Sequence, residues 1–330
     1  MTPVVCFGEL MLRLSPPGQE RFFQTPTLRT WFGGSEANVA VGLKHLGSPS
    51  RYITRLPENA VGDAALAALR AEGVDTRDVV RGGARLGIYY VESGADIRPM
   101  RVVYDRAGSA FSQLDEGAVD WAAALKDATW LHLSGITPAL GEGPARAALA
   151  AARAARHLGV KVSLDLNFRP ALWAGRDPRP LVEPLARASD LLVGNPGAFA
   201  AMLGVATPEG AGDQLVREAS RRVHETLGCV HVAVTRRDVK SASHHGWNAC
   251  LYDAATDGFY VSRRYAVNVV DRVGGGDSFV AGLLHALRTG HTPASALEFA
   301  TAASALKLTI PGDFNRVSAD EVHRLLDTPP

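Results

Sequence analysis

The feature that most constrains the fold is a regular alternation of two patterns between residues 130 and 235. Short apolar runs typical of buried strands take turns with longer amphipathic segments of helical period. The runs lie at 130–135, 160–167, 190–195 and 229–235, and the helical segments at 142–159, 178–189, 196–204 and 213–227. Strands that alternate with helices pair in parallel, because each crossover returns the chain to the same end of the sheet. We therefore expect an α/β fold with a mainly parallel central sheet covered by helices.

Two segments depart from this pattern. Residues 10–33 and 84–106 consist of short half-apolar pieces separated by turn residues, which is typical of exposed strands. We expect them to form one small β-sheet, a lid inserted into a single domain that spans residues 1–330, with a ligand in the cleft below it. Strands without intervening helices near 239–261 predict an antiparallel extension at one edge of the main sheet. Ser35 is the expected N-cap of the first helix.

The composition bears on the class of protein. Of the 330 residues, 46% are hydrophobic and 21% charged, and the formal net charge of +1 provides no field that would attract nucleic acid or a membrane. Cys6, Cys229 and Cys250 have no C-x-x-C spacing, so we expect neither a disulfide framework nor a thiolate zinc site. The first residues contain no basic leader, and no apolar run approaches the ~18 residues of a membrane span. We expect a cytoplasmic protein.

Three successive glycines, Gly274, Gly275 and Gly276, precede Asp277 at the start of a helical pattern. Residues without a Cβ can adopt positive φ and turn successive backbone N–H groups into one concavity, which suits a phosphate at a helix start. The alternative is a simple turn followed by an ordinary first-turn acid. The spacing matches neither G-x-G-x-x-G nor G-x-x-x-x-G-K-[ST].

A carboxylate beside such an anion nest suggests phosphoryl transfer to a hydroxyl. The glycine amides would hold the moving phosphoryl group, and Asp277 would aim the acceptor hydroxyl. The positive end of the helix is expected to lower the pKa of Asp277 and so make it a poor base. Its expected role is therefore mainly orientation, which suffices for a loose transition state in which the hydroxyl proton leaves late.

Two motifs resemble the signatures of the ribokinase-like (PfkB) carbohydrate kinases. "VVDRVGGGDSFVAG" is similar to the C-terminal signature D-T/P-x-G-A-G-D-x-F, with Gly275 in place of alanine. "WFGGSEANVAVGLKHLG" is similar to the first signature, in which a glycine pair, here Gly33 and Gly34, and an asparagine, Asn38, face the sugar. The resemblance covers essentially the whole chain. It implies the family's ribokinase-like three-layer α/β fold and a sugar kinase activity.

Within the family, four segments resemble 2-keto-3-deoxygluconate kinases more than ribokinases or fructokinases: "LHLSGITPAL", "VSLDLNFRPALW", "RVVYDRAGSAF" and "ASALKLTIPGDFN". An acidic sugar also fits Arg106, at the end of a lid strand, and Arg169, at the carboxyl end of a body strand, because a guanidinium binds a carboxylate bidentately. The alternative is that both arginines are solvated or structurally paired. The resemblance implies that the sugar acid is surrounded by Gly34, Tyr89 or Tyr90, Tyr104, Arg106, Asn167 and Arg169, with Asp277 on its terminal hydroxyl. Asp313 would lie nearby, or serve only as a turn residue after Gly312.

The resemblance also implies that ATP and Mg²⁺ are bound. The nucleotide residues would be Asn195, Thr235 and Arg236, together with the nest glycines Gly274 and Gly276. Two departures are notable. Ala198 occupies the place of an acid associated with magnesium, and "VTRRDVKSAS" lacks the glycines of the usual T-x-G-x-x-G loop. The metal ligands are therefore not assigned.

Other functions stay open at this point. A neutral-sugar kinase, acting on fructose or ribose, would not need Arg169, and Ala198 suggests a sugar-acid-binding protein of the same fold without catalysis. His244 and His245 are adjacent in a predicted strand and point to opposite sides, so we do not expect them to bind one metal ion together. An exposed lid of few strands is an edge that a second copy could cover, which predicts a homodimer through the lid.

Overall fold

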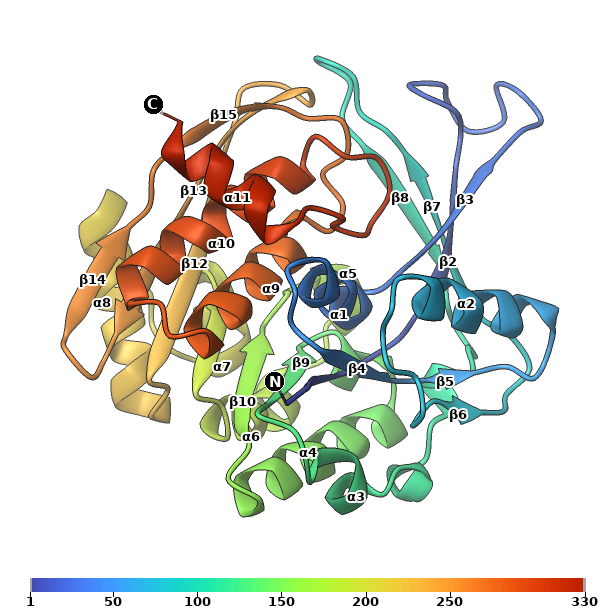
Figure 1. Ribbon diagram of the computed structural model, residues 1–330, viewed down its shortest axis with the longest axis horizontal. Helices are drawn as coiled ribbons and strands as arrows, with labels where there is room; N and C mark the ends of the chain where they lie inside the picture. Colours follow the sequence, from blue (N-terminus) through green and yellow to red (C-terminus); the bar gives the residue numbers. More distant parts are fainter. Residues whose placement is uncertain (1, 329–330) are drawn as a thin grey trace.

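The computed structural model describes residues 2–328 and is built around one nine-stranded sheet (Figure 1). The sheet is parallel from β4 to β12 and antiparallel beyond β12, so the expected parallel core and antiparallel edge are both present. Its strands, in spatial order, are β14 (Gly258–Val261), β13 (His244–Asp253), β12 (His231–Val239), β11 (Leu191–Gly194), β10 (Lys161–Asp165), β9 (Trp130–Ser134), β1 (Val4–Phe7) and β4 (Ser50–Ile53), and β15 (Tyr265–Asn268) also pairs with β13.

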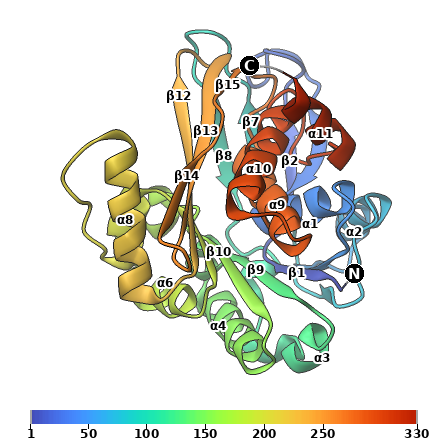
Figure 2. The same cartoon turned by 60° about the vertical axis from the view of Figure 1, so that its left-hand side comes forward.

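Helices cover both faces of this sheet, as Figure 2 shows. Each face has its own hydrophobic core, one between the sheet and each helical layer. One layer consists of α1 (Ser35–His45), α2 (Ala60–Ala71), α9 (Gly275–Arg288), α10 (Pro293–Lys307) and α11 (Ala319–Asp327). The other consists of α3 (Trp121–Leu125), α4 (Glu142–His157), α5 (Pro170–Trp173), α6 (Arg179–Arg187), α7 (Pro196–Leu203) and α8 (Gly212–Leu227). The expected α/β fold class is confirmed.

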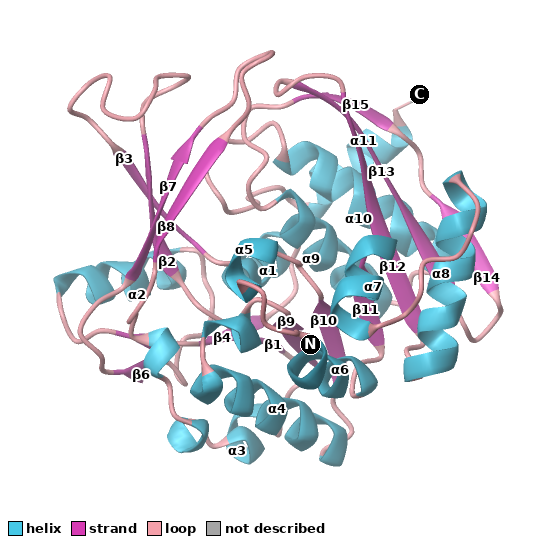
Figure 3. Ribbon diagram, turned by 180° about the vertical axis from the view of Figure 1, so that it is seen from behind, coloured by secondary structure: helices cyan, strands magenta, loops and turns pink. Residues whose placement is uncertain are grey.

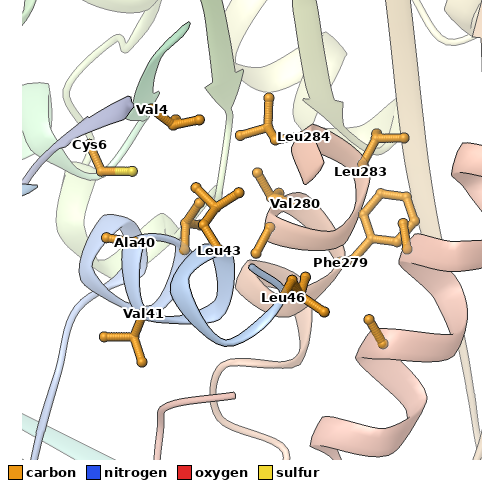
Figure 4. Packing of buried hydrophobic residues seen from close by; sticks show 14 of the residues in the cluster. Val4, Cys6, Ala40, Val41, Leu43, Leu46, Phe279, Val280, Leu283 and Leu284 are labelled. Carbon is orange, nitrogen blue, oxygen red and sulfur yellow. The ribbon is translucent and has the colours of Figure 1, made fainter. Parts of the chain in front are cut away.

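Small residues bring α9 close to its neighbours. A Cβ on Gly42 of α1 would lie 2.9 Å from the Cβ of Ala281, and a Cβ on Gly282 would lie 2.8 Å from the Cα of Ala300 in α10. The fully buried Val280 and Leu284 lie on the same helix in this core (Figure 4). Close packing of this kind leaves little room for displacement. It therefore fixes the position of the amino end of α9, where the glycine run lies.

A second sheet of four strands stands away from β12 and β13 (Figures 1 and 3). It has the order β3 (Arg29–Gly33), β2 (Met11–Ser15), β7 (Gly87–Glu92) and β8 (Arg101–Asp105), and it draws its strands from both segments with the exposed-strand pattern. Met11, Tyr89 and Val91 form a small buried cluster on one of its faces. We call this four-stranded sheet the lid sheet. A separate two-stranded sheet pairs β5 (Arg55–Leu56) with β6 (Val80–Arg81), and 3₁₀ turns occur at Phe111–Gln113, Glu116–Ala118 and Thr137–Leu140.

Two local predictions are corrected by the structure. The N-cap of α1 is Gly34 and not Ser35, because a Cβ at position 34 would clash with the carbonyl oxygen of Glu9 and the Ser35 hydroxyl donates instead to Asp277. The carboxyl-terminal helix α11, which begins with a capping box at Ser318 and Glu321, was not predicted. Among residues 2–328, no helix has both the length and the apolar character needed to cross a membrane.

Candidate active site

A cavity of about 650 Å³ lies between the lid sheet and the carboxyl ends of the parallel strands. Its wall is completed by the amino ends of α1 and α9, which is where ligands bind in folds of this class. Most of the residues singled out in the sequence line it: Gly34, Asn38, Tyr89, Tyr104, Arg106, Asn167, Arg169, Asn195, Thr235, Gly274, Gly275, Gly276, Asp277 and Asp313.

Three of the predicted site residues are absent from the lining of this cavity. Tyr90 lies on the other face of the lid sheet, where its ring packs edge-on against Phe22. Arg236 forms an ion pair with Asp213. Gly33 is buried behind the wall, and a Cβ there would clash with the carboxylate of Asp313. Gly33 therefore serves close packing in this structure, and Tyr90 and Arg236 are directed elsewhere.

The glycine run forms the amino end of α9. Gly274 is the N-cap with a φ of 80°, in the left-handed region, and a Cβ there would also clash with the carbonyl oxygen of Asp313. The amide of Gly275 donates to the carbonyl of Arg272 at 3.3 Å, whereas within residues 2–328 the amides of Gly276 and Asp277 have no hydrogen-bond acceptor. Two free N–H groups at a helix start are suited to bind an anion.

Asp277 is buried next to these amides and faces the cavity. Its carboxylate accepts hydrogen bonds from Ser35 Oγ at 2.9 Å and from Asn38 Nδ2 at 2.7 Å. Burial nevertheless raises the pKa of Asp277 from 3.8 to about 6, against the lowering effect of these two donors and of Arg169. The expectation of a lowered pKa is therefore wrong, because loss of hydration outweighs the field of the helix.

Besides Glu9, which is paired with Arg106, two carboxyl groups that the sequence analysis did not select line the cavity. Asp165, at the end of β10, has its pKa raised to about 7 by burial and by the nearby charge of Asp277. Glu36 in α1 accepts hydrogen bonds from Ser134 and Thr137, and burial raises its pKa to about 7 as well. Sharing of negative charge among three buried carboxyl groups favours protonation of at least one of them near neutral pH.

Buried ion pairs tie the lid sheet to the body. Arg13 of β2 is 1% exposed and contacts Asp271 Oδ2 at 2.7 Å and Asp313 Oδ2 at 2.8 Å. Asp271 in turn accepts the amides of Val273 and Gly312, at 3.0 and 3.1 Å. The Tyr89 hydroxyl donates to Asp313. Asp313 is thus a fully engaged structural charge at the cavity wall as well as a lining residue.

Arg106 is also paired on the lid side. Its Nε and Nη2 both donate to Glu9 Oε2, and the Ser109 hydroxyl donates to Glu9 Oε1 at 2.5 Å. The guanidinium lies 5.6 Å from the ring centroid of Tyr104, which is stacked on Tyr89. Glu9 therefore occupies the Nε–Nη2 edge of the Arg106 guanidinium, and that edge cannot bind a ligand carboxylate. The guanidinium of Arg169 can bind one bidentately.

The opposite end of the cavity is formed by β11, β12 and the segment before α9. Asn195 caps α7, with its Oδ1 accepting the amide of Ala198 at 3.0 Å. Thr235 and Arg237 line the cavity from one side of β12, while the intervening Arg236 points away. Arg237 and Arg272 are arginines of this wall that the sequence analysis did not select.

Comparison with known proteins places the chain in a family. The pattern of the pfkB family carbohydrate kinases matches residues 1–319. The 2-dehydro-3-deoxygalactonokinase of Haloferax volcanii is 35% identical over 98% of this chain and 96% of its own length, and the 2-dehydro-3-deoxygluconokinase of Thermoproteus tenax is 33% identical over 95% and 90%. The crystal structure of 2-dehydro-3-deoxygluconokinase from Thermotoga maritima has a TM-score of 0.96 and 40% identity over 99% of this chain and 98% of that chain.

The chain belongs to the pfkB family of carbohydrate kinases. Enzymes of this family are phosphotransferases, so the anion nest and Asp277 lie in the cavity of a kinase. The resemblance deduced from the two sequence signatures is confirmed, as is the likeness to 2-keto-3-deoxygluconate kinases.

Whether this pfkB-family kinase can hold Mg²⁺ depends on its oxygen ligands. Within residues 2–328 no cluster of three or more His, Cys, Asp or Glu side chains could bind a metal alone. Mg²⁺ with a nucleotide needs only one or two carboxylates, since phosphates and water supply the other ligands. Asp165 fits, because its Oδ1 accepts only the amide of Asn167 and its Oδ2 has no partner in the described chain.

Proposed function

We propose that this kinase transfers the γ-phosphoryl group of ATP to the terminal hydroxyl of 2-keto-3-deoxygluconate or of the acid that differs from it at C4. The observation that carries the proposal is that one cavity holds Asp277, an anion nest and an unpaired Arg169. The names of the relatives support the substrate class, and they include enzymes for both the gluconate-derived and the galactonate-derived acid.

In the proposed reaction Asp277 accepts the hydrogen of the terminal hydroxyl, whose oxygen forms a bond to the γ-phosphorus. The bond from this phosphorus to the β-γ bridging oxygen breaks, and its electron pair leaves with ADP. A pKa of about 6 makes the Asp277 carboxylate a suitable base near neutral pH. The free amides of Gly276 and Asp277 would hold the phosphoryl oxygens. Mg²⁺, bound with the phosphates and Asp165, would neutralise phosphate charge.

On the substrate side, Arg169 would bind the carboxylate of the sugar acid. It caps α5 through its backbone, and within the described chain its guanidinium has no hydrogen-bond or ion-pair partner. Asn167, with φ of 38°, is held by Asp165 Oδ1 and donates to Ser35 Oγ at 2.9 Å, so the loop that carries Arg169 is tied to the Asp277 network. Tyr104 and Arg106 would form the lid-side wall of the sugar site.

A substrate panel tests the proposal. The purified protein is assayed for ADP release with both C4 epimers of the keto acid and with fructose and ribose. We expect turnover with at least one acid and loss of most of it in Arg169→Ala, on the order of 10²-fold in kcat/KM for the loss of a charged hydrogen-bonded partner. Turnover of a neutral sugar that Arg169→Ala leaves intact would overturn the proposal in favour of a neutral-sugar kinase.

A catalytically silent sugar-acid-binding protein is the second candidate, favoured by Ala198 in place of the acid associated with magnesium. The same assay decides. ADP release that is stimulated by sugar acid excludes a pure binding protein. Tight binding of the acid without any turnover, in the presence of Mg²⁺ and ATP, would support it.

We also propose that the enzyme is a cytoplasmic homodimer that pairs through the lid sheet. Most of β8 is exposed, including Val103 at 51%. Both β3 and β8 are edge strands of this sheet, and pairing between copies would cover an edge. The three cysteines are buried and unpaired, which suits a reducing compartment. Sedimentation should give twice the mass of the 35.0 kDa chain, and a monomer at all concentrations would contradict the dimer.

A further inference from the structure

Three arginines of the cavity wall have no acidic partner. Within residues 2–328, Arg169, Arg237 and Arg272 make no ion pair, and the only side-chain hydrogen bond among them is from Arg272 Nε to Met100 Sδ at 3.4 Å. The other lining arginine, Arg106, is paired with Glu9. Surface arginines elsewhere in the chain commonly lie against a carboxylate, as Arg236 does with Asp213. Other arginines of the described chain that form no ion pair, such as Arg21 and Arg153, are exposed, whereas these three share the wall of one cavity.

Arg237 and Arg272 lie at the end of the cavity that holds the anion nest, and Arg272 also reaches Met100 in the β7–β8 connection of the lid. Arg237 is two residues beyond Thr235 on β12, so both side chains lie on the same side of the strand. Arg272 is two residues before Gly274, the N-cap of α9. The lid residues assigned to the sugar acid, Tyr104 and Arg106, come from β8 and the residue that follows it. Arg272 thus precedes the nest directly in the chain, and Arg237 lines the same cavity from β12.

The three cations also oppose one another. Burial lowers the pKa of Arg237, and the charge of Arg169 lowers it further. Burial followed by Arg237 and Arg169 lowers the pKa of Arg272 in the same direction. Arginine nevertheless stays charged at neutral pH. The carboxylates of Asp165, Asp271 and Asp277 offset part of this repulsion without forming ion pairs, and an anion bound beside the arginines would offset more of it.

We infer that Arg237 and Arg272 bind the polyphosphate chain of the nucleotide, on the side of the nest opposite to the sugar acid. This role rests on the proposed ATP-dependent kinase function. Arg237 lies in the segment that lacks the glycines of the usual nucleotide loop, and Ala198 lies where an acid associated with magnesium is usual. Two guanidinium groups supply direct charge neutralisation and planar hydrogen-bonding forks for phosphate oxygens. They complement the free amides of Gly276 and Asp277, which lie together at the start of α9 and so can bind only one end of the polyphosphate.

The test measures binding without any sugar. Isothermal titration calorimetry is performed with three probes: inorganic tripolyphosphate, AMP-PNP with Mg²⁺, and adenosine. The variants are Arg237→Met and Arg272→Met, and Arg236→Met is the matched control, because Arg236 is adjacent on β12 but is paired with Asp213 outside the cavity. Thermal unfolding verifies that each variant is folded. If a methionine variant fails to fold, the lysine variant at the same position replaces it, because lysine keeps the charge and loses the fork.

Each methionine variant should bind tripolyphosphate and AMP-PNP about tenfold more weakly or worse, as expected for loss of one charged hydrogen-bonded contact. A lysine variant should bind both polyphosphate probes several-fold more weakly than the parent protein. Adenosine binding, sugar-acid binding and the Arg236→Met control should stay within about twofold of the parent protein. Unchanged tripolyphosphate affinity in both variants would overturn the inference, as would loss of sugar-acid binding in its place. Because the polyphosphate probes involve no sugar, a wrong sugar assignment would leave this result standing.

Discussion

The two ends of the cavity differ in how their charges are balanced. On the lid side, the buried Arg13 and the partly buried Arg106 lie against carboxylates of the same chain, and every one of these charges has a partner. On the side of β12 and the segment before α9, Arg237 and Arg272 have no acidic partner within the described residues. The first end is therefore complete before any ligand binds, while the second is completed by an anion. We infer that the lid wall of the acceptor site is preorganised, whereas Arg169, Arg237 and Arg272 receive their counter-charges from the bound anions.

The largest effect is expected at the junction of the two ends, where Asp277 lies. Asp277→Asn keeps the shape of the side chain but removes the acceptor of the hydroxyl proton, so kcat should fall on the order of 10³-fold. Binding of AMP-PNP should change little, because the nest amides remain. Steady-state kinetics and calorimetry measure the two effects separately. Comparable losses in kcat and in nucleotide affinity would mean that Asp277 shapes the nest and is not an acceptor for the proton.

The next largest effect is a difference in the free energy of unfolding between substitutions of one arginine from each end of the cavity. Arg13→Met leaves Asp271 and Asp313 buried without their counter-charge, which should lower the free energy of unfolding by about 3 kcal/mol. Arg237→Met removes an unpaired charge and should change it by no more than about 0.5 kcal/mol. Denaturant unfolding of both variants provides the comparison. Equal destabilisation by the two substitutions would contradict the division between a complete and an incomplete end.

Much of this site is predictable because it depends on residues that are close together in the sequence. The glycine run, Asp277 and the pattern of α1 lie within short segments whose conformation follows from their own residues. The alternation of side chains along a strand also indicates which residues face the cavity. Once Thr235 was assigned to the cavity, a period of two residues selects Arg237 and excludes Arg236. By the same rule only one of the adjacent tyrosines on β7 can face the cavity, and that residue is Tyr89 and not Tyr90.

Other features depend on contacts that no local pattern encodes. Arg13 pairs with Asp313 across 300 residues of sequence, and Arg106 pairs with Glu9 across 97. The segment around Asp313 predicts a site or turn residue but not a partner for Arg13, and nothing in the segment around Glu9 marks it as the partner of Arg106. The pKa of Asp277 likewise depends on how deeply the whole fold buries it, and the position at a helix end alone predicts a shift of the wrong sign.

The smallest effect is in the pH dependence of activity, which tests whether the pKa of Asp277 is raised or lowered. A group with a raised pKa keeps its proton to higher pH, so the active carboxylate form of Asp277 is lost as pH falls through about 6. Activity should then decline about tenfold for each further unit of pH. A pKa lowered by the helix below the ordinary 3.8 would instead keep the carboxylate form, and therefore the activity, constant down to about pH 5. ATP itself titrates near this range, so the profile of the parent enzyme alone does not identify the group.

Ser35→Ala separates the enzyme from the nucleotide in this experiment. The Ser35 hydroxyl donates to Asp277 Oδ1 and lowers the pKa of that carboxyl, so its removal should move the acidic limb of the profile to higher pH. Titration of ATP is the same for both enzymes and cancels in the comparison. An unmoved limb would assign the titration to another group. A limb moved to lower pH would contradict the role of Ser35 Oγ as a donor that lowers the pKa of Asp277.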